Sequence, residues 1–131
     1  MKNVYQKYQS QSVQTASREK LLLMLYEGAI KFMKKAILAI EAKNIAERGL
    51  NIGRAYDIVM ELNNTLDHKV GGEIAKNLEQ LYMFITDRLT QATIKNDVKA
   101  LQEALKIMET LYQGWVEAIE KLKKEDASQK P

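Results

Sequence analysis

The sequence contains no cysteine, one histidine and one proline, which is the last residue. Without cysteine the chain can form no disulfide, zinc–thiolate site or iron–sulfur cluster and has no cysteine nucleophile. The longest apolar run, Leu21 to Tyr26, is far shorter than the roughly 18 residues that cross a bilayer. The first fifteen residues are polar and lack the apolar core of a signal peptide. We therefore expect a single-domain cytoplasmic protein that is not inserted in a membrane.

The net charge of +3 is unevenly distributed along the chain. Residues 1–43 carry eight Lys or Arg and three Glu, whereas residues 44–131 carry twelve basic and fourteen acidic residues. A basic first third fits nucleic acid, an acidic partner or simply a solvated helix face. There is no run of five Lys or Arg and no RNA-stacking motif, so we expect no nucleic acid partner. A small helical nucleic-acid-binding bundle remains an alternative interpretation.

Apolar residues recur at alternating steps of three and four, which is the pattern of one buried helix face. The first such stripe runs from Leu22 to Ile40 and predicts a helix over 17–43, with Ser17 as its N-cap. Three further stripes predict helices over 45–69, 73–95 and 97–124, each with its stripe buried in the core. Their members are Ile45, Gly49, Ile52, Tyr56, Val59, Asn63 and Leu66; Ile74, Leu78, Leu81, Ile85, Leu89 and Ala92; and Val98, Leu101, Leu105, Met108, Tyr112, Trp115, Ile119 and Leu122. The breaks between them fall at Lys43-Asn44, Gly71-Gly72 and Asn96-Asp97.

Four long helices joined by short turns must run antiparallel to their neighbours in sequence. The predicted fold is therefore all-α, an up-down four-helix bundle. Residues 1–16 precede the predicted bundle as a short leader that is expected to cap its apolar surface. Residues 17–124 form the predicted bundle, and residues 125–131 form a frayed polar tail.

His68 is the only histidine, and its position bears on several kinds of chemistry. A phosphotransfer bundle, a further alternative, needs an exposed histidine in mid-helix, whereas His68 is predicted to end the second helix and interact with its dipole. A di-iron carboxylate bundle needs Glu-x-x-His pairs, but Thr65 stands three residues before His68. Gly71-Gly72 is followed by Glu73 and not by the residues of a phosphate-binding loop. We expect no enzyme, no catalytic residue, no metal and no cofactor.

Two predicted helices have wider apolar faces than a bundle requires. The last helix carries a second, mostly small-residue stripe of Ala100, Ala104, Ile107, Leu111, Gly114 and Ala118. The first helix adds Leu21, Met24, Leu25, Gly28 and Phe32 to its core stripe. Either the core is broad, or a partner's amphipathic helix packs on these faces. The pattern alone favours neither interpretation over the other.

Several motifs are spread over nearly the whole chain: Tyr8, residues 13–17, 20–30 and 71–75, Leu78, Leu81, Tyr82, residues 88–92 and 95–97, Leu111 and Trp115. In order and spacing they resemble the FliS family of flagellar export chaperones. One departure is Arg18, where the family usually has proline as the first helical residue. Proline there would only preset the turn into the helix, so the departure hardly affects the expected fold.

The resemblance implies a chaperone that binds the disordered C-terminal segment of flagellin in hydrophobic helix grooves, without ATP, and prevents polymerisation before type III export. It also implies that the N-terminal Tyr segment lies over part of the client groove. Besides flagellin, the flagellar export apparatus is a candidate partner, and we expect a monomer or a weak homodimer. The candidate flagellin-binding residues are Tyr8, Val13, Ile52, Tyr56, Ile107, Leu111, Gly114 and Ala118.

Overall fold

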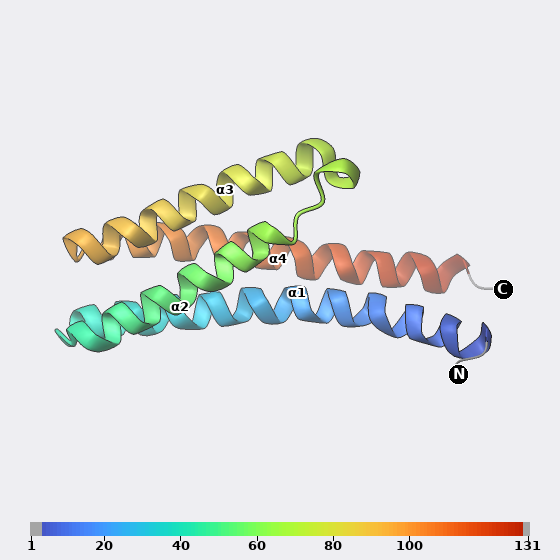
Figure 1. Ribbon diagram of the computed structural model, residues 1–131, viewed down its shortest axis with the longest axis horizontal. Coiled ribbons are helices and arrows are strands. Elements are labelled where there is room, and N and C mark those ends of the chain that lie inside the picture. The colour runs from blue at the N-terminus through green and yellow to red at the C-terminus, as the bar shows by residue number, and fades with distance from the viewer. Residues whose placement is uncertain (1–3, 130–131) are drawn as a thin grey trace.

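A computed structural model describes the backbone of residues 4–129 and the side chains of residues 17–128. Its four helices are α1 (Val4–Glu41), α2 (Ile45–Asn64), α3 (His68–Lys95) and α4 (Val98–Gln129). Both α1 and α3 pack against α2 and α4, and successive helices run in opposite directions (Figure 1). This arrangement confirms the predicted all-α, up-down four-helix bundle.

The core consists of one apolar stripe from each helix. The stripe predicted for the first helix is buried as expected at Tyr26, Ala29, Met33 and Ala36. The other helices contribute Ile52, Ala55, Val59, Leu62, Leu78, Tyr82, Ile85, Leu89, Ala92, Ala100, Leu101, Ala104 and Met108. Several members of the predicted stripes are instead exposed, namely Ile45, Gly49, Tyr56, Ile74, Leu81 and Leu122. Ile45 and Ile74 lie close to the starts of α2 and α3.

Two predicted helix boundaries at the ends of the chain are wrong. The first helix begins at Val4, not at residue 17, and Ser17 lies inside it as an exposed residue. No Gly or Pro interrupts residues 4–17, so nothing in this stretch stops the helix. For the same reason α4 continues to Gln129, beyond the predicted end at residue 124.

The predicted breaks at residues 43–44 and 96–97 are confirmed, and local side chains explain them. Lys43 and Asn96 adopt left-handed φ values of 59° and 53°. The Asn44 side chain then caps α2 by accepting a hydrogen bond from the Glu47 amide at 3.2 Å. The Asp97 carboxylate accepts from the Lys99 and Ala100 amides at 3.0 and 3.2 Å at the start of α4.

The connection between α2 and α3 differs from the prediction. The second helix ends at Asn64, not at residue 69, and the Thr65 hydroxyl donates to the Leu62 carbonyl at 2.7 Å. Asp67 caps α3 by accepting from the amides of residues 69 and 70. His68 therefore begins α3 and does not end α2, because Asp67 is a strong N-cap. Gly72, with φ 50° and ψ −124°, interrupts α3 one turn later, which confirms the break predicted there.

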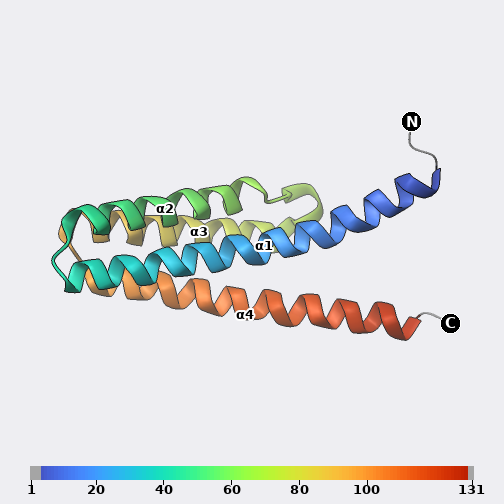
Figure 2. The ribbon, with the colours of Figure 1, turned by 90° about the horizontal axis from the view of Figure 1, so that it is seen from below.

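The helices differ in length, and this leaves one end of the bundle open. The N-terminal end of α1 and the C-terminal end of α4 extend past α2 and α3 (Figure 2). Within residues 4–129 no helix is both long and apolar enough to cross a membrane.

Candidate functional site

An apolar pocket lies beyond the end of α2, between α1, α3, α4 and the connection from α2 to α3. We call it the Trp115 pocket. Its volume is about 340 Å³, and its apolar wall consists of Leu22, Leu66, Val70, Ile74, Ala75, Leu78, Tyr82 and Trp115. All four helices or their connections therefore contribute to it. A concave, mostly apolar surface of this size is suited to apolar side chains of a partner.

The rim of the Trp115 pocket is unusually apolar for exposed surface. Val70 is 86% exposed and Ile74 is 69% exposed. Both flank the break at Gly72, which turns the first turn of α3 away from the rest of the helix. When a partner covers such exposed aliphatic side chains, the free energy of the complex falls by about 25 cal/mol for each Å² of apolar surface buried.

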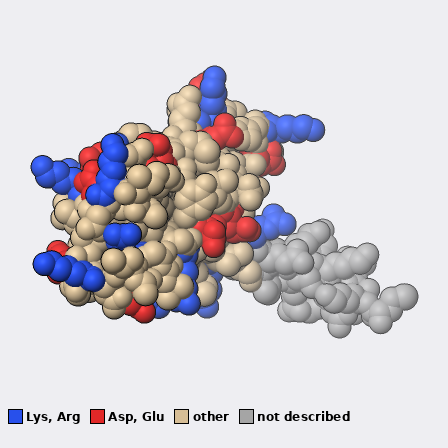
Figure 3. Space-filling view, turned by 60° about the vertical axis from the view of Figure 1, so that its left-hand side comes forward, with Lys and Arg blue, Asp and Glu red and all other residues tan. Residues whose placement is uncertain are grey.

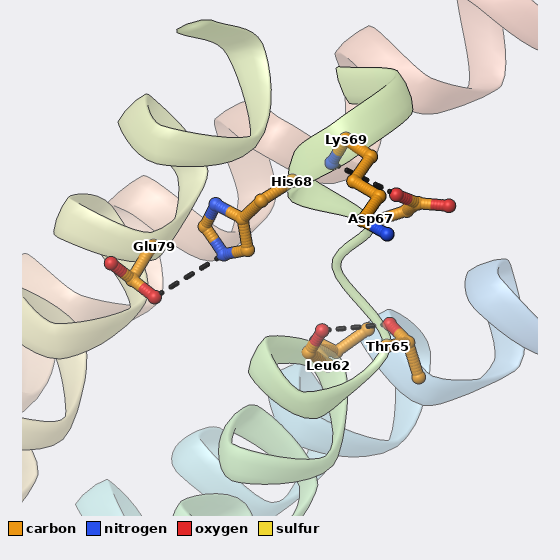
Figure 4. Close-up of polar contacts among 6 residues, drawn as sticks. All are labelled: Leu62, Thr65, Asp67, His68, Lys69 and Glu79. Atoms are coloured by element: carbon orange, nitrogen blue, oxygen red, sulfur yellow. Dashed lines mark hydrogen bonds and ion pairs between the residues drawn. The ribbon is translucent and has the colours of Figure 1, made fainter. Parts of the chain in front are cut away.

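Polar contacts hold this rim in place (Figure 4). His68 Nε2 lies 3.4 Å from a carboxylate oxygen of Glu79, which stands beyond the break on the same helix. Asp67 fixes the backbone amides of Lys69 and Val70 at 3.0 and 3.1 Å. Of these contacts, only the one between His68 and Glu79 connects the two parts of α3 across Gly72. His68 therefore contacts α3 and not the C-terminus of α2, where the sequence analysis had expected it.

A chain of hydrogen bonds crosses the bundle behind the pocket. The Trp115 indole Nε1 donates to the Tyr26 hydroxyl at 3.1 Å, and the hydroxyls of Tyr26 and Tyr82 are hydrogen-bonded to each other. The chain links α4, α1 and α3. Burial raises the pKa of both tyrosines, so the phenols remain neutral at physiological pH and the pocket floor carries no charge. Trp115, predicted to be buried in the core, is only partly buried.

The structure separates the candidate binding residues into groups. Ile52 is 3% exposed and belongs to the core, whereas Tyr56, one turn later on α2, is 38% exposed. On α4, Ile107 and Leu111 are partly buried against the core. Gly114 and Ala118 are exposed, with no atom within 4 Å of where a Gly114 Cβ would lie. The side chains of Tyr8 and Val13 lie outside the described residues.

The second stripe on the last helix has two parts with different environments. Its first two members, Ala100 and Ala104, are fully buried, so the broad-core interpretation is correct for them. Its last two members, Gly114 and Ala118, face solvent. Because α2 and α4 lie on a diagonal of the bundle, Tyr56 and the α4 residues belong to different surfaces.

Sequence reasoning did not single out Val70 and Ile74. Val70 belongs to no stripe, and Ile74 fits the core stripe of the third helix. The useful signal was local, since Gly71-Gly72 stands between these two aliphatic residues. A break there removes the preceding turn from the helix and from its packing.

The face seen in Figure 3 carries dispersed Lys, Arg, Asp and Glu side chains with uncharged surface between them. It offers no continuous basic strip for a nucleic acid backbone. Among the side chains of residues 17–128, no group of three His, Asp or Glu is arranged to hold a metal ion.

Comparisons with known proteins agree with the sequence motifs. Residues 1–122 match the family model described as flagellar protein FliS. The flagellar secretion chaperone FliS of Vibrio cholerae is 36% identical over 119 residues, which cover 88% of each chain. The chaperone of the same name from Bacillus subtilis is 35% identical over 125 residues, 95% of this chain and 92% of its own. The FliS chaperone of Escherichia coli is 30% identical over 109 residues, 82% of this chain and 80% of its own. The chain therefore belongs to the FliS family of flagellar secretion chaperones.

Proposed function

We propose that this protein is a cytoplasmic, non-enzymatic chaperone that binds the disordered C-terminal segment of flagellin and prevents its polymerisation before type III export. One observation above all supports the proposal: a folded bundle keeps Val70 and Ile74 in water beside an apolar pocket. Membership of the flagellar secretion chaperone family supports a flagellar client, and the apolar pocket supports binding through apolar side chains.

The mode of binding follows from the shape of this surface. An amphipathic helix places apolar side chains at steps of three and four, and such a row fits a groove between helices. In the Trp115 pocket the row would contact Leu22, Ile74 and Leu78, which belong to two different helices. Covering the client's apolar face removes the surface through which it would associate with its own kind, and this requires no nucleotide.

A client held only in this pocket would leave the other candidate residues uncovered. Tyr56 and the pair Gly114 and Ala118 are exposed on different helices. We propose that the client wraps around the bundle and reaches these surfaces with further segments, with Ile107 and Leu111 beneath the segment on α4. Ile52 on α2 is buried in the core and does not touch the client. The export apparatus is the expected receiver of the loaded complex.

The experiment is a comparison of two isoleucines on the same helix. Ile74 and Ile94 are 69% and 71% exposed, and both belong to α3, but only Ile74 borders the pocket. Ile74→Gln should weaken binding of a labelled flagellin C-terminal peptide by about tenfold, as expected when a buried aliphatic contact is lost. Ile94→Gln should leave it unchanged.

The same variants are then assayed with whole flagellin, whose polymerisation is followed by light scattering. The wild-type protein and Ile94→Gln should suppress polymerisation at equimolar ratio, and Ile74→Gln should require an excess. Equal behaviour of the two variants would remove the pocket from the proposal. Absence of any flagellin binding by the wild-type protein would refute the proposed function itself.

A further inference from the structure

We infer that the outer side of α1 and the groove between α1 and α4 form a second docking surface, for an amphipathic helix with acidic residues along one flank. This α1 outer face consists of Leu21, Met24, Lys31, Lys35 and Leu38, which follow one another at steps of three, seven, four and three. Gly28 lies at its edge and faces α2, since a Cβ there would lie 3.3 Å from Ile58. It is independent of the Trp115 pocket, to which none of these residues contributes.

The first reason is uncovered apolar surface on a helix that already has a full core stripe. Leu21, Met24 and Leu38 are each more than half exposed. They lie at both ends of the face, which spans about 26 Å at 1.5 Å per residue. This length matches a partner helix of about five turns.

The second reason is the shape of the surface. Between α1 and α4 lies a groove of about 610 Å³, with Ile30, Leu38 and Tyr112 as its apolar lining. A concave strip between two helices accepts the side-chain ridge of a third helix. A flat bilayer surface could not enter it.

The third reason is an excess of basic groups without acidic partners. Lys31, Lys35 and Arg54 gather around one aromatic ring, at 5.5, 5.9 and 5.4 Å from the centroid of Phe32. None of the three lies within 4.0 Å of a carboxylate among the side chains of residues 17–128. A row of carboxylates on a partner would relieve the mutual repulsion of these cations.

The acidic groups in the groove are already engaged by this chain. Glu109 lies 3.8 Å from the Lys34 ammonium. Desolvation and the neighbouring Glu27 carboxylate, which lines the same groove, raise the pKa of Tyr112. The groove is therefore acidic toward α4 and basic toward α2, so the partner's carboxylates must face the α2 side. The two glutamates also disfavour an anionic membrane as the occupant.

The test uses a designed, fluorescently labelled peptide of about 18 residues, with Leu at steps of three and four and Glu along one flank. A matched peptide carries Gln in place of each Glu. The acidic peptide should bind the full-length protein, more weakly as salt is raised, and the Gln peptide should bind at least about tenfold more weakly.

Two double variants with the same change in net charge locate the site. Lys31→Glu with Lys35→Glu should weaken binding of the acidic peptide by about tenfold or more. Lys76→Glu with Lys99→Glu, at exposed positions on α3 and α4, should leave it unchanged. All of these side chains are exposed, and circular dichroism checks that the helical fold is retained.

Several outcomes would overturn the inference. Failure of the acidic peptide to bind would do so, as would equal losses in the two double variants, which would show only general charge attraction. Loss of peptide binding in Ile74→Gln would place the peptide in the Trp115 pocket. Binding to phosphatidylglycerol vesicles that depends on Lys31 and Lys35 would identify a membrane as the occupant. An effect of the Lys31 and Lys35 variant on flagellin binding alone would make this face part of the client site.

Discussion

The hydrogen-bonded pair of Tyr26 and Tyr82 should show strong non-additivity when its hydroxyls are removed. Both residues are almost completely buried, and their hydroxyls bond to each other across the bundle. Tyr26 also accepts from the Trp115 indole. Replacement of either tyrosine by Phe keeps the ring and its packing but leaves the remaining hydroxyl without this partner in a dry environment.

The magnitudes follow from these partners. Tyr82→Phe should lower the free energy of unfolding by about 1–2 kcal/mol, and Tyr26→Phe by about 2–3 kcal/mol, because it loses two hydrogen bonds and isolates the Tyr82 hydroxyl. The double variant leaves no unpaired buried hydroxyl. The Trp115 indole N–H, which loses the Tyr26 hydroxyl as its acceptor, donates to water instead, because Trp115 is partly exposed. Its loss should therefore be at least about 1 kcal/mol smaller than the sum of the single losses.

The assay is urea unfolding followed by far-ultraviolet circular dichroism, with a common slope for all variants. Tyr56→Phe, at an exposed tyrosine on α2, serves as the control and should change stability by less than about 0.5 kcal/mol. Additivity of the two core variants within about 0.3 kcal/mol would refute the reasoning. It would mean that the two hydroxyls do not depend on each other.

Three further predictions concern Trp115, Gly114 and the N-terminal leader. Trp115→Ala should cost less than the about 3–5 kcal/mol of a fully buried tryptophan, measured by urea unfolding, because part of the indole is exposed. Gly114→Leu meets no obstacle within 4 Å at Cβ, so the fold should persist while a flagellin segment on α4 binds more weakly in a titration. Deletion of residues 2–12 should increase self-association in ultracentrifugation and accelerate client binding if the leader covers the client surface. Unchanged values in both measurements would leave the leader without this role.

The parts of the fold that the sequence predicts correctly depend on local chemistry or on period. The stripe through Tyr26 and Met33 is buried because a helix in a bundle presents one face to its neighbours. The breaks at Asn44 and Asn96 arise from side chains and φ values that act within a few residues. Such features need no knowledge of the rest of the chain.

The errors arise where two local signals compete or where none is present. Leu66 continues the apolar period of the second helix, but Asp67 caps the next helix, and the cap determines the boundary. At the start of the chain no stop signal exists, so the helix extends to Val4. Ile74 has the period of a core residue, yet it is exposed because α2 ends before reaching it. Exposure at this position is a property of the assembled bundle.

The unequal helices connect the fold to the proposed function. With 38 residues α1 spans about 57 Å, whereas α2, with 20 residues, spans about 30 Å. A bundle of equal helices would cover every apolar stripe with its own neighbours. Here α1 and α4 extend beyond α2 and α3 (Figure 2). Apolar positions near the open end of the bundle, such as Leu22 and Ile74, therefore border a pocket and are not part of a closed core. A client helix placed there would act as the continuation of α2 or α3. The core stripe from Tyr26 to Ala36 is buried without such a client.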